Sequence, residues 1–348
     1  MSMRGRHITL LLPGLAGPVS DPPVSAYLDA RPVALDRLLS RCVTESAAGT
    51  DLNTTLAGCF GLQYESSDAV PVAALSCLSD SGAAPSGYLM RADPVHLRAD
   101  QSSLRLFDSH SFAVTQAEAD ELVAAFNGFY AERGWRLEAA RPQRWYLSMS
   151  SDPEIDTRTI SDVVGRSVDA CLPRGEAAAS WHAILNEIQM LFHDHPVNAA
   201  REQRGEPLIN SVWFWGGGKL PTDVQARAAR VATDHPLAMG LAQQAAVSRM
   251  DAPVDAAELL AALENGQTLV VNDVLDGPAQ YGDIESWLDA LWQLEQHWFG
   301  PLLAAVESAT IDSLEILPCN AHCYRTNRKQ QRAFWKRKRF FEEVCSDE

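Results

Sequence analysis

Two kinds of hydrophobic pattern alternate along the chain, and each predicts a different secondary structure. Short apolar runs bounded by turn residues, at 8–12, 267–275 and 313–318, are typical of buried strands. Strand-like segments also occur at 87–100, 102–108 and 144–150. Segments with apolar residues three and four positions apart, or rich in alanine, are typical of helices. These helical segments are 115–134, 176–192, 223–232, 255–266 and 283–300.

Local signals predict the ends of two of these helices. Thr115 and Glu118 have the spacing of a capping box at the start of one helix, and Gly134 stands where its C-terminal cap is expected. The last long helix is expected to end at Gly300-Pro301, because proline lacks the backbone N–H that would continue it.

Buried strands that alternate with helices predict a mostly parallel sheet with helices on both faces. Because such strands occur near both ends of the chain, we expect both ends to contribute to one sheet. The middle of the chain is expected to form an inserted α+β subdomain. The predicted divisions are a discontinuous α/β core over 1–87 and 206–323, the inserted subdomain over 88–205, and a basic C-terminal tail over 324–348.

Composition and charge narrow the functional classes. The 348 residues carry a formal net charge of −16, which argues against general binding of nucleic acids or anionic membranes, because phosphates would be repelled. Seven cysteines in apolar surroundings are typical of reduced thiols in a cytoplasmic protein. Arginines before the apolar run at 8–12 imitate a signal peptide, but Pro13-Gly14 interrupts that run, so we interpret it as a first strand. No segment reaches the roughly 18 apolar residues of a membrane-spanning helix.

The segment LFHDHPVNAAREQRGEPLINSVWFWGGGKLP, residues 191–221, concentrates side chains that carry chemistry. His193 and His195 flank Asp194, which raises the hypothesis of a metal site, although zinc or manganese would need further ligands from elsewhere. A helix that ends at His195-Pro196 explains the same residues without a metal, and we favour this interpretation.

The second half of this segment runs from a buried-strand pattern into three glycines, 216–218, and Lys219. Consecutive glycines let backbone N–H groups approach an anion closely, and the lysine adds a mobile positive charge. A plain turn at the end of a strand needs the same small residues. The pattern therefore leaves two interpretations open, an anion site and a turn.

The whole segment resembles a motif of the archaeal- and bacterial-type cofactor-independent phosphoglycerate mutases. That motif reads His-Pro-Val-Asn, a short helix with an arginine, and then Asn-x-x-Trp-x-Trp-Gly-x-Gly-Arg/Lys-x-Pro. The matching positions are His195, Pro196, Val197, Asn198, Arg201, Gly205, Asn210, Trp213, Trp215, Gly216, Gly218, Lys219 and Pro221. Weaker similarities at 49–62, 89–97 and 270–303 extend the resemblance over most of the chain.

The resemblance implies an alkaline-phosphatase-like fold. In that superfamily two divalent metals are bound by aspartates and histidines, and a serine or threonine is phosphorylated in transit. Thr50, with Asp51 beside it, stands at the position of this nucleophile. Most of the implied metal ligands are absent: Pro13-Gly14 replaces Asp-Gly, Asp276 is followed by Gly277 and Gln280 in place of Asp-Glu-x-x-His, and Cys319-Asn320 replaces an Asp-His pair.

We therefore expect a degenerate, non-catalytic, phosphoglycerate-mutase-like protein that binds a small anionic or phosphorylated ligand and has a regulatory role. It is similar to a divergent bacterial branch described as regulator of pathogenicity factors, type E. No cofactor or metal is expected, and Asp51 and Asp276 are candidate relics of a metal site. The alternative is an active metal-dependent phosphotransferase with rearranged ligands, Thr50 as nucleophile, and manganese or zinc as cofactor.

The expected ligand-binding residues are Arg91, Asp93, His195, Asn198, Arg201, Asn210, Trp215, Gly216, Gly217, Gly218 and Lys219. Arg91 and Asp93 share one face of a strand, where they either line a cleft with Lys219 or form a structural ion pair. The tail at 324–348 mixes basic and aromatic residues, so it either binds an acidic or protein partner or folds back on the acidic body of the chain.

Overall fold

The computed structural model describes residues 5–20, 22–100, 103–333, 335 and 339–345. Contacts within the chain divide it into two compact units. We call Met1–Tyr64 together with Asp223–Glu348 the outer unit, and Glu65–Thr222 the inserted unit. These boundaries differ from the expected ones, because residues 65–87 and 206–222 belong to the inserted unit rather than to the α/β core.

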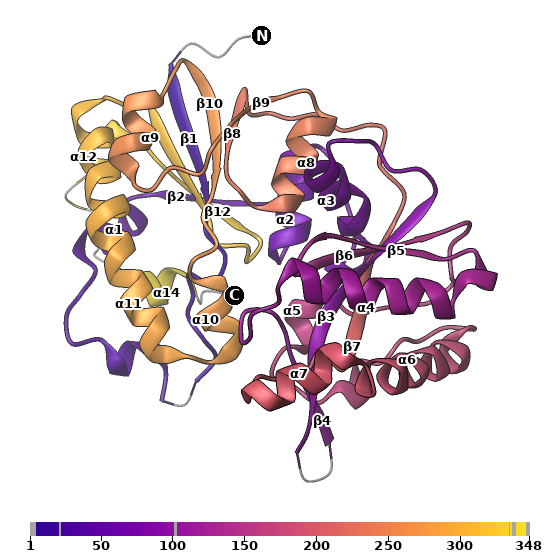
Figure 1. Cartoon of the computed structure of the whole chain (residues 1–348). Coiled ribbons are helices and arrows are strands. Elements are labelled where there is room, and N and C mark those ends of the chain that lie inside the picture. The colour runs from indigo at the N-terminus through magenta and orange to yellow at the C-terminus, as the bar shows by residue number, and fades with distance from the viewer. Residues whose placement is uncertain (1–4, 21, 101–102, 334, 336–338, 346–348) are drawn as a thin grey trace. The chain divides into compact units, whose positions relative to one another are not determined.

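The outer unit is built around a seven-stranded sheet to which both ends of the chain contribute (Figure 1). In sheet order the strands are β2 Val43–Ser46, β12 His322–Thr326, β11 Ser313–Leu317, β1 Arg6–Leu11, β10 Gly266–Val271, β8 Arg230–Ala232 and β9 Ser248–Met250. β1 is parallel to β10 on one side and to β11 on the other. β8 and β9 continue the parallel order, whereas β12 is antiparallel to both of its neighbours, β11 and β2. The predicted mostly parallel sheet, shared by both ends of the chain, is confirmed.

Alternation along β1 gives this sheet two different faces. Ile8 and Leu10 are fully buried in the main hydrophobic core, which includes residues of helices α1, α9, α11 and α12. Thr9 points to the opposite face, which α2 and α8 cover (Figure 1). The helices of the outer unit are η1 Val24–Tyr27, α1 Val33–Ser40, α2 Leu52–Cys59, α8 Pro236–Gln244, α9 Ala256–Ala262, α10 Asp276–Tyr281, α11 Ile284–Leu294, η5 Glu295–Phe299, α12 Gly300–Ser308, α13 Arg328–Gln331 and α14 Phe341–Cys345.

The inserted unit contains a five-stranded antiparallel sheet of β3 Tyr88–Asp100, β4 Ser103–Phe107, β5 Arg136–Arg141, β6 Arg144–Met149 and β7 Ser211–Gly218. The long strand β3 pairs with β4, β6 and β7. One face packs against α4 and α6 in a core that includes Trp145 and Phe214, and α3 packs against the other through Ala73 and Tyr146. The helices of this unit are η2 Ser67–Ala69, α3 Val72–Ser81, α4 Gln116–Phe129, η3 Ala131–Arg133, α5 Ile160–Val163, η4 Val168–Ala170, α6 Ala178–His193 and α7 Pro196–Arg204.

Some local predictions are confirmed and others are wrong. The capping box of Thr115 and Glu118 is present at α4. The alanine-rich segment 223–232 is not a helix: it ends in β8, where parallel pairing with β10 and β9 outweighs helix propensity. The helix at 283–300 does not stop at Gly300-Pro301, because a π-helical turn, η5, leads directly into α12. Proline is tolerated in the first turn of α12, where its missing N–H is not needed.

The strand before the three glycines forms, but in a different sheet from the one expected. β7 pairs with β3 in the inserted unit and not with the strands of the α/β core. Its register places Trp213 opposite Asp93 and Trp215 opposite Arg91. The motif residues at 195–219 therefore build the inserted unit.

The described part of the C-terminal tail packs on the outer unit. Phe341 is fully buried in the main core and stacks on Trp287 at 6.3 Å between ring centroids. Arg31 donates to both oxygens of Glu342, at 2.8 and 2.7 Å. The basic residues 336–338 lie outside the described residues. Within the described part of the chain, no helix combines the length and apolar character needed to cross a bilayer.

Candidate functional site

The start of α2 carries the predicted nucleophile Thr50 and its neighbour Asp51. Asp51 is the N-cap of α2: its Oδ1 accepts from the Thr54 backbone N–H at 3.0 Å, and its Oδ2 accepts from the Thr54 hydroxyl at 2.6 Å. Thr50 itself is exposed, and its backbone N–H donates to the Thr54 hydroxyl at 3.2 Å. Both carboxylate oxygens of Asp51 thus serve the helix, which is the usual role of aspartate at this position.

The turn after β11 brings a buried thiol to this region. The turn is tied to the segment before α2, since the Ala321 N–H donates to the Gly49 carbonyl at 3.0 Å. Cys319 has a left-handed backbone, with φ of 65°, and is buried. Burial raises the pKa of the Cys319 thiol, the negative charges of Asp276 and Asp51 add to the shift, and the Thr55 side chain opposes it. At ordinary pH Cys319 is therefore a neutral thiol.

The side chains at the start of α2 and in the turn after β11 do not fit a two-metal centre. Among the residues that the structure describes, no group of three or more histidine, cysteine, aspartate or glutamate side chains could hold a metal ion. Asp276 accepts from the Gln280 amide at 2.8 Å, within the same helix. A catalytic zinc needs about three protein ligands, and a two-metal site needs more. The sequence-based expectation of no bound metal stays a prediction.

The two histidines at 193 and 195 mark the junction of two helices. α6 ends at His193, and His195 is the N-cap of α7, where its Nδ1 accepts from the Val197 N–H at 3.3 Å. Pro196 occupies the first turn of α7. The helix-end interpretation of this stretch is confirmed.

The three glycines at the end of β7 lie against neighbouring side chains. A Cβ on Gly217 would stand 2.5 Å from the Tyr88 hydroxyl, and one on Gly218 would stand 2.6 Å from Pro71. Gly216 and Gly218 also have positive φ, of 59° and 156°. Close packing and backbone conformation thus explain the glycines without a bound anion. Lys219, directly after them, is exposed.

Arg91 and Asp93 form a buried ion pair in the inserted unit. Asp93 Oδ1 accepts from Arg91 Nη2 at 2.7 Å and from Nε at 2.9 Å, and its Oδ2 accepts from the Trp215 indole N–H at 2.7 Å. The Arg91 guanidinium lies over the Trp215 ring, 5.1 Å from its centroid. Burial raises the pKa of Asp93, and the charge of Arg91 opposes the shift. The structure therefore brings three predicted ligand residues together, as partners of one another.

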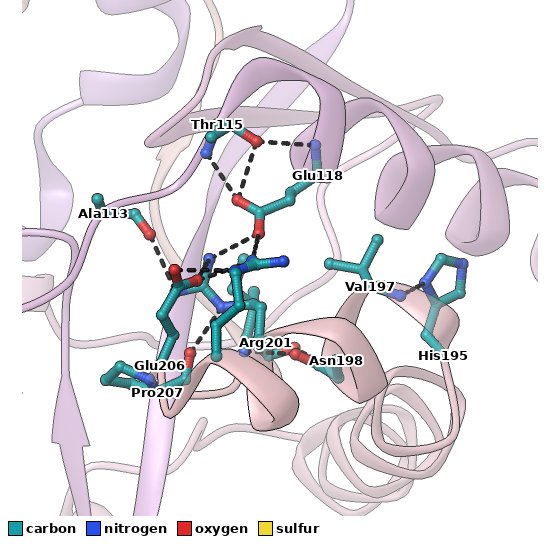
Figure 2. A network of polar contacts seen from close by, with 11 residues as sticks. Ala113, Thr115, Glu118, His195, Val197, Asn198, Arg201, Glu206 and Pro207 are labelled. Carbon is teal, nitrogen blue, oxygen red and sulfur yellow. Dashed lines mark hydrogen bonds and ion pairs between the residues drawn. The ribbon is translucent and has the colours of Figure 1, made fainter.

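Arg201 is also held by protein acceptors, as Figure 2 shows. Its side chain is 1% exposed, and it donates to the carbonyls of Pro207 and Ala113 and, at 3.0 Å, to the carboxylate of Glu118. Glu118 is the same residue that closes the capping box of α4. All three guanidinium nitrogens have a partner, so Arg201 joins α7, α4 and the segment leading to β7.

The side-chain amides of the two asparagines in the motif form hydrogen bonds with backbone groups of other residues. The buried amide of Asn198 donates to the carbonyls of Phe192 and Ile209 and accepts from the Ile209 N–H, each at 2.8 Å. The amide of Asn210 pairs in the same way with both backbone groups of Leu97 on β3. Such bonds satisfy backbone groups where regular pairing ends. These motif residues thus fix the path of the chain into β7.

Sequence reasoning missed a polar cavity in the outer unit, which we call the sheet cavity. It measures about 210 Å³ and lies on the sheet face opposite the main core, beside α2. Thr9, Gln267 and Glu315 form its floor, and Glu45, Arg227 and Arg325 are further charged residues of its lining. The signal in the sequence is a polar residue at alternate positions of otherwise apolar strands, as in Thr9 of ITLLL and Glu315 of SLEIL.

Comparisons with known proteins show relatedness over part of the chain. No family model matches it. Over 161 residues it is 27% identical to a probable 2,3-bisphosphoglycerate-independent phosphoglycerate mutase of Geobacter sulfurreducens, covering 43% of this chain and 38% of that protein. Over 163 residues it is 28% identical to the 2,3-bisphosphoglycerate-independent phosphoglycerate mutase of Methanothrix thermoacetophila, covering 42% of each. The chain thus spans about two-fifths of the length of these curated relatives.

A solved structure of the PH0037 protein from Pyrococcus horikoshii has a similar fold, with a TM-score of 0.55, 14% identity, and coverage of 99% of this chain and 92% of that one. The α/β fold class predicted from the sequence, alkaline-phosphatase-like with an inserted α+β part, is confirmed. Over part of its length, the chain is related to the 2,3-bisphosphoglycerate-independent phosphoglycerate mutases.

Proposed function

We propose that this chain is a phosphoglycerate-mutase-like protein that has lost phosphoryl transfer and acts by binding a small anionic or phosphorylated ligand. The single observation that carries the loss is Cys319-Asn320, which stands where the resemblance implies an Asp-His pair. Cys319 is buried in a turn that is tied to the segment before α2. Two-metal phosphoryl transfer needs carboxylate and imidazole side chains that bind the cations.

The neighbouring groups support the same conclusion. Asp51 is engaged as a helix cap, and Asp276 accepts from Gln280. A threonine hydroxyl such as that of Thr50 is a weak nucleophile unless a base or a metal activates it. This part of the chain therefore retains the position of the nucleophile without the groups that would activate it.

Lys219 is the cation best placed to meet a ligand among the predicted ligand-binding residues. Arg91 and Arg201 are buried and bonded to protein acceptors, whereas Lys219 is exposed. A regulatory role in the bacterial cytoplasm, as in the branch described as regulator of pathogenicity factors, type E, is part of this proposal. Binding without turnover is the chemistry that such a role requires.

An activity assay with metal analysis tests the loss of transfer. The purified full chain is assayed for mutase activity on 3-phosphoglycerate and for phosphatase activity on p-nitrophenyl phosphate, with and without excess Mn²⁺. We expect no activity above background and no stoichiometric transition metal. Manganese-stimulated activity that disappears in Thr50→Ala, but persists in the control Thr44→Ala, would establish the active phosphotransferase instead.

Calorimetry tests the ligand. We expect 3-phosphoglycerate to bind the wild-type chain and Lys219→Ala to weaken binding by about tenfold, the loss of one charge-assisted contact. The control is Lys329→Ala, which removes another exposed lysine, on α13. If 3-phosphoglycerate and inorganic phosphate both fail to bind, or if the two variants behave alike, the ligand part of the proposal is wrong.

A further inference from the structure

The sheet cavity has a floor whose polar groups are already ordered by one another. Gln267 Nε2 donates to the Thr9 hydroxyl at 2.7 Å, and that hydroxyl donates to Glu315 Oε2 at 2.9 Å. Arg325 Nε donates to the other oxygen, Glu315 Oε1, at 2.8 Å. A polar surface held in place before a ligand arrives loses little conformational entropy on binding.

Two carboxylates of the cavity, those of Glu45 and Glu315, form ion pairs with a single guanidinium, that of Arg325. Arg325 contacts Glu315 and also Glu45, at 3.1 Å. Two negative charges therefore share one positive charge. The side of the cavity formed by these residues keeps a net negative charge and attracts a second cation.

A separate positive charge belongs to the same cavity. Arg227 lies in a segment that is fixed on both sides: the Gln225 N–H donates to the Phe60 carbonyl at 2.9 Å, and the Ala229 N–H donates to the Gln267 carbonyl at 2.8 Å. Arg227 is exposed and has no hydrogen-bond or ion-pair partner among the described residues. Arg227 and Cys59 of α2 both line the cavity, and the positive charge of Arg227 opposes the rise in the pKa of Cys59.

Size and charge together define the class of ligand. The four charged side chains of the lining, Glu45, Arg227, Glu315 and Arg325, sum to zero, which disfavours a polyanion. A volume of about 210 Å³ corresponds to roughly seven water molecules of about 30 Å³ each, which suits a molecule of a few heavy atoms. A small zwitterion matches both properties, because it presents one charge of each sign.

We infer that the sheet cavity binds a small amino acid, with its carboxylate at Arg227 and its ammonium group at Glu45 and Glu315. The lining of this cavity includes Thr55, Gly58 and Cys59 of α2 but neither Thr50 nor Asp51. The inference rests on the proposed function only in taking ligand binding as the role of the chain.

Calorimetry on the full chain with glycine, L-alanine, L-serine and L-threonine tests this inference. At least one of them should bind with a Kd below about 10 mM, the weak end expected for so few heavy atoms. For alanine, L-lactate removes the ammonium group and ethylamine removes the carboxylate. For serine, L-glycerate and ethanolamine do the same. Each replacement should weaken binding by about tenfold or more, because it leaves one charge of the cavity unmatched.

Two matched variants locate the site. Arg227→Gln removes the exposed guanidinium of the cavity and should weaken amino-acid binding by about tenfold. Arg249→Gln removes another exposed arginine of the outer unit, on β9 and bonded to Gln243, and should change the Kd by less than about twofold.

Three results would overturn the inference: none of the four amino acids binds at 10 mM, the lactate and glycerate analogues bind equally well, or the two arginine variants behave alike. Mutase activity in the wild-type chain would overturn the proposed function but would leave an amino-acid binding result intact. Failure of amino-acid binding would leave the 3-phosphoglycerate test at Lys219 unaffected. The two proposals therefore fail separately.

Discussion

Replacing Asn198 with alanine separates the structural role of the HPVN motif from a ligand-binding role. The Asn198 side chain is 1% exposed and makes three hydrogen bonds of 2.8 Å to backbone groups of Phe192 and Ile209. Alanine removes all three and leaves the Ile209 carbonyl and N–H without this partner, whereas the Phe192 carbonyl still accepts from the His195 N–H. If the residue is structural, the loss appears in stability before any ligand is added.

The magnitude follows from the number of bonds. A buried hydrogen bond contributes about 1 kcal/mol net, so three give a loss of about 3 kcal/mol in the free energy of unfolding. This corresponds to roughly a hundredfold change in the folding equilibrium, since 1.4 kcal/mol is about tenfold. The control is Asn272→Ala, which removes a single bond of 3.3 Å at a partly exposed turn, and we expect it to cost less than about 1 kcal/mol.

Urea denaturation measures the total loss, and hydrogen–deuterium exchange locates it. The midpoint of unfolding should move to lower urea in Asn198→Ala, and peptides that cover residues 205–215 should exchange faster while peptides of the outer unit do not change. Equal midpoints for Asn198→Ala and Asn272→Ala would refute the assignment. If Asn198→Ala is as stable as the wild-type chain but no longer binds 3-phosphoglycerate, Asn198 is a ligand-binding residue.

Three further predictions concern other parts of the chain. Gly217→Ala should lower the free energy of unfolding by about 1–3 kcal/mol, because its Cβ would stand 2.5 Å from the Tyr88 hydroxyl. The control is Gly277→Ala, whose Cβ would meet no atom within 4 Å, and equal denaturation midpoints of the two variants would contradict the packing argument. Phe341→Ala should cost about 3–5 kcal/mol in thermal or urea unfolding, because it empties a fully buried aromatic site; a neutral result would show that the tail does not stabilise the outer unit. Burial, aided by Glu315, raises the pKa of Cys59 from 9.0 to about 12, so the folded state keeps its proton when the unfolded state has lost it. The stability contributed by this thiol is therefore fully present below pH 9 and is lost as the pH rises from 9 to 12. The urea midpoint of the wild-type chain should fall over that range, and Cys59→Ala should reduce this fall more than the control Cys171→Ala does.

The fold could be predicted from the sequence wherever one local pattern dominates. β1, the capping box of α4 and the buried face of α11 follow from apolar periodicity and capping chemistry alone. The strand β8 could not be predicted, because three residues in an alanine-rich segment carry too little pattern, and only pairing with β10 and β9 makes them a strand. The same holds for η5, whose π-helical turn absorbs Gly300-Pro301 without a break.

The site was harder to predict than the fold, because residue type does not reveal its partner. Arg201, Asn198 and Asn210 have the chemistry to bind a ligand, but their donors go to backbone groups and to Glu118. Asp51 looks like a metal ligand in the sequence and is a helix cap in the structure. The sheet cavity depends on β1, β10, β11 and β12 lying side by side, which no local pattern specifies.

The order of the strands also has a consequence for synthesis of the protein on the ribosome. β1 has both of its neighbours, β10 and β11, more than 250 residues later in the chain, whereas residues 65–222 form a contiguous unit. The inserted unit can therefore fold while the outer sheet is still incomplete. Until those later strands emerge, the apolar β1 has no native strand partner, so the nascent chain exposes this apolar segment throughout translation of the insert.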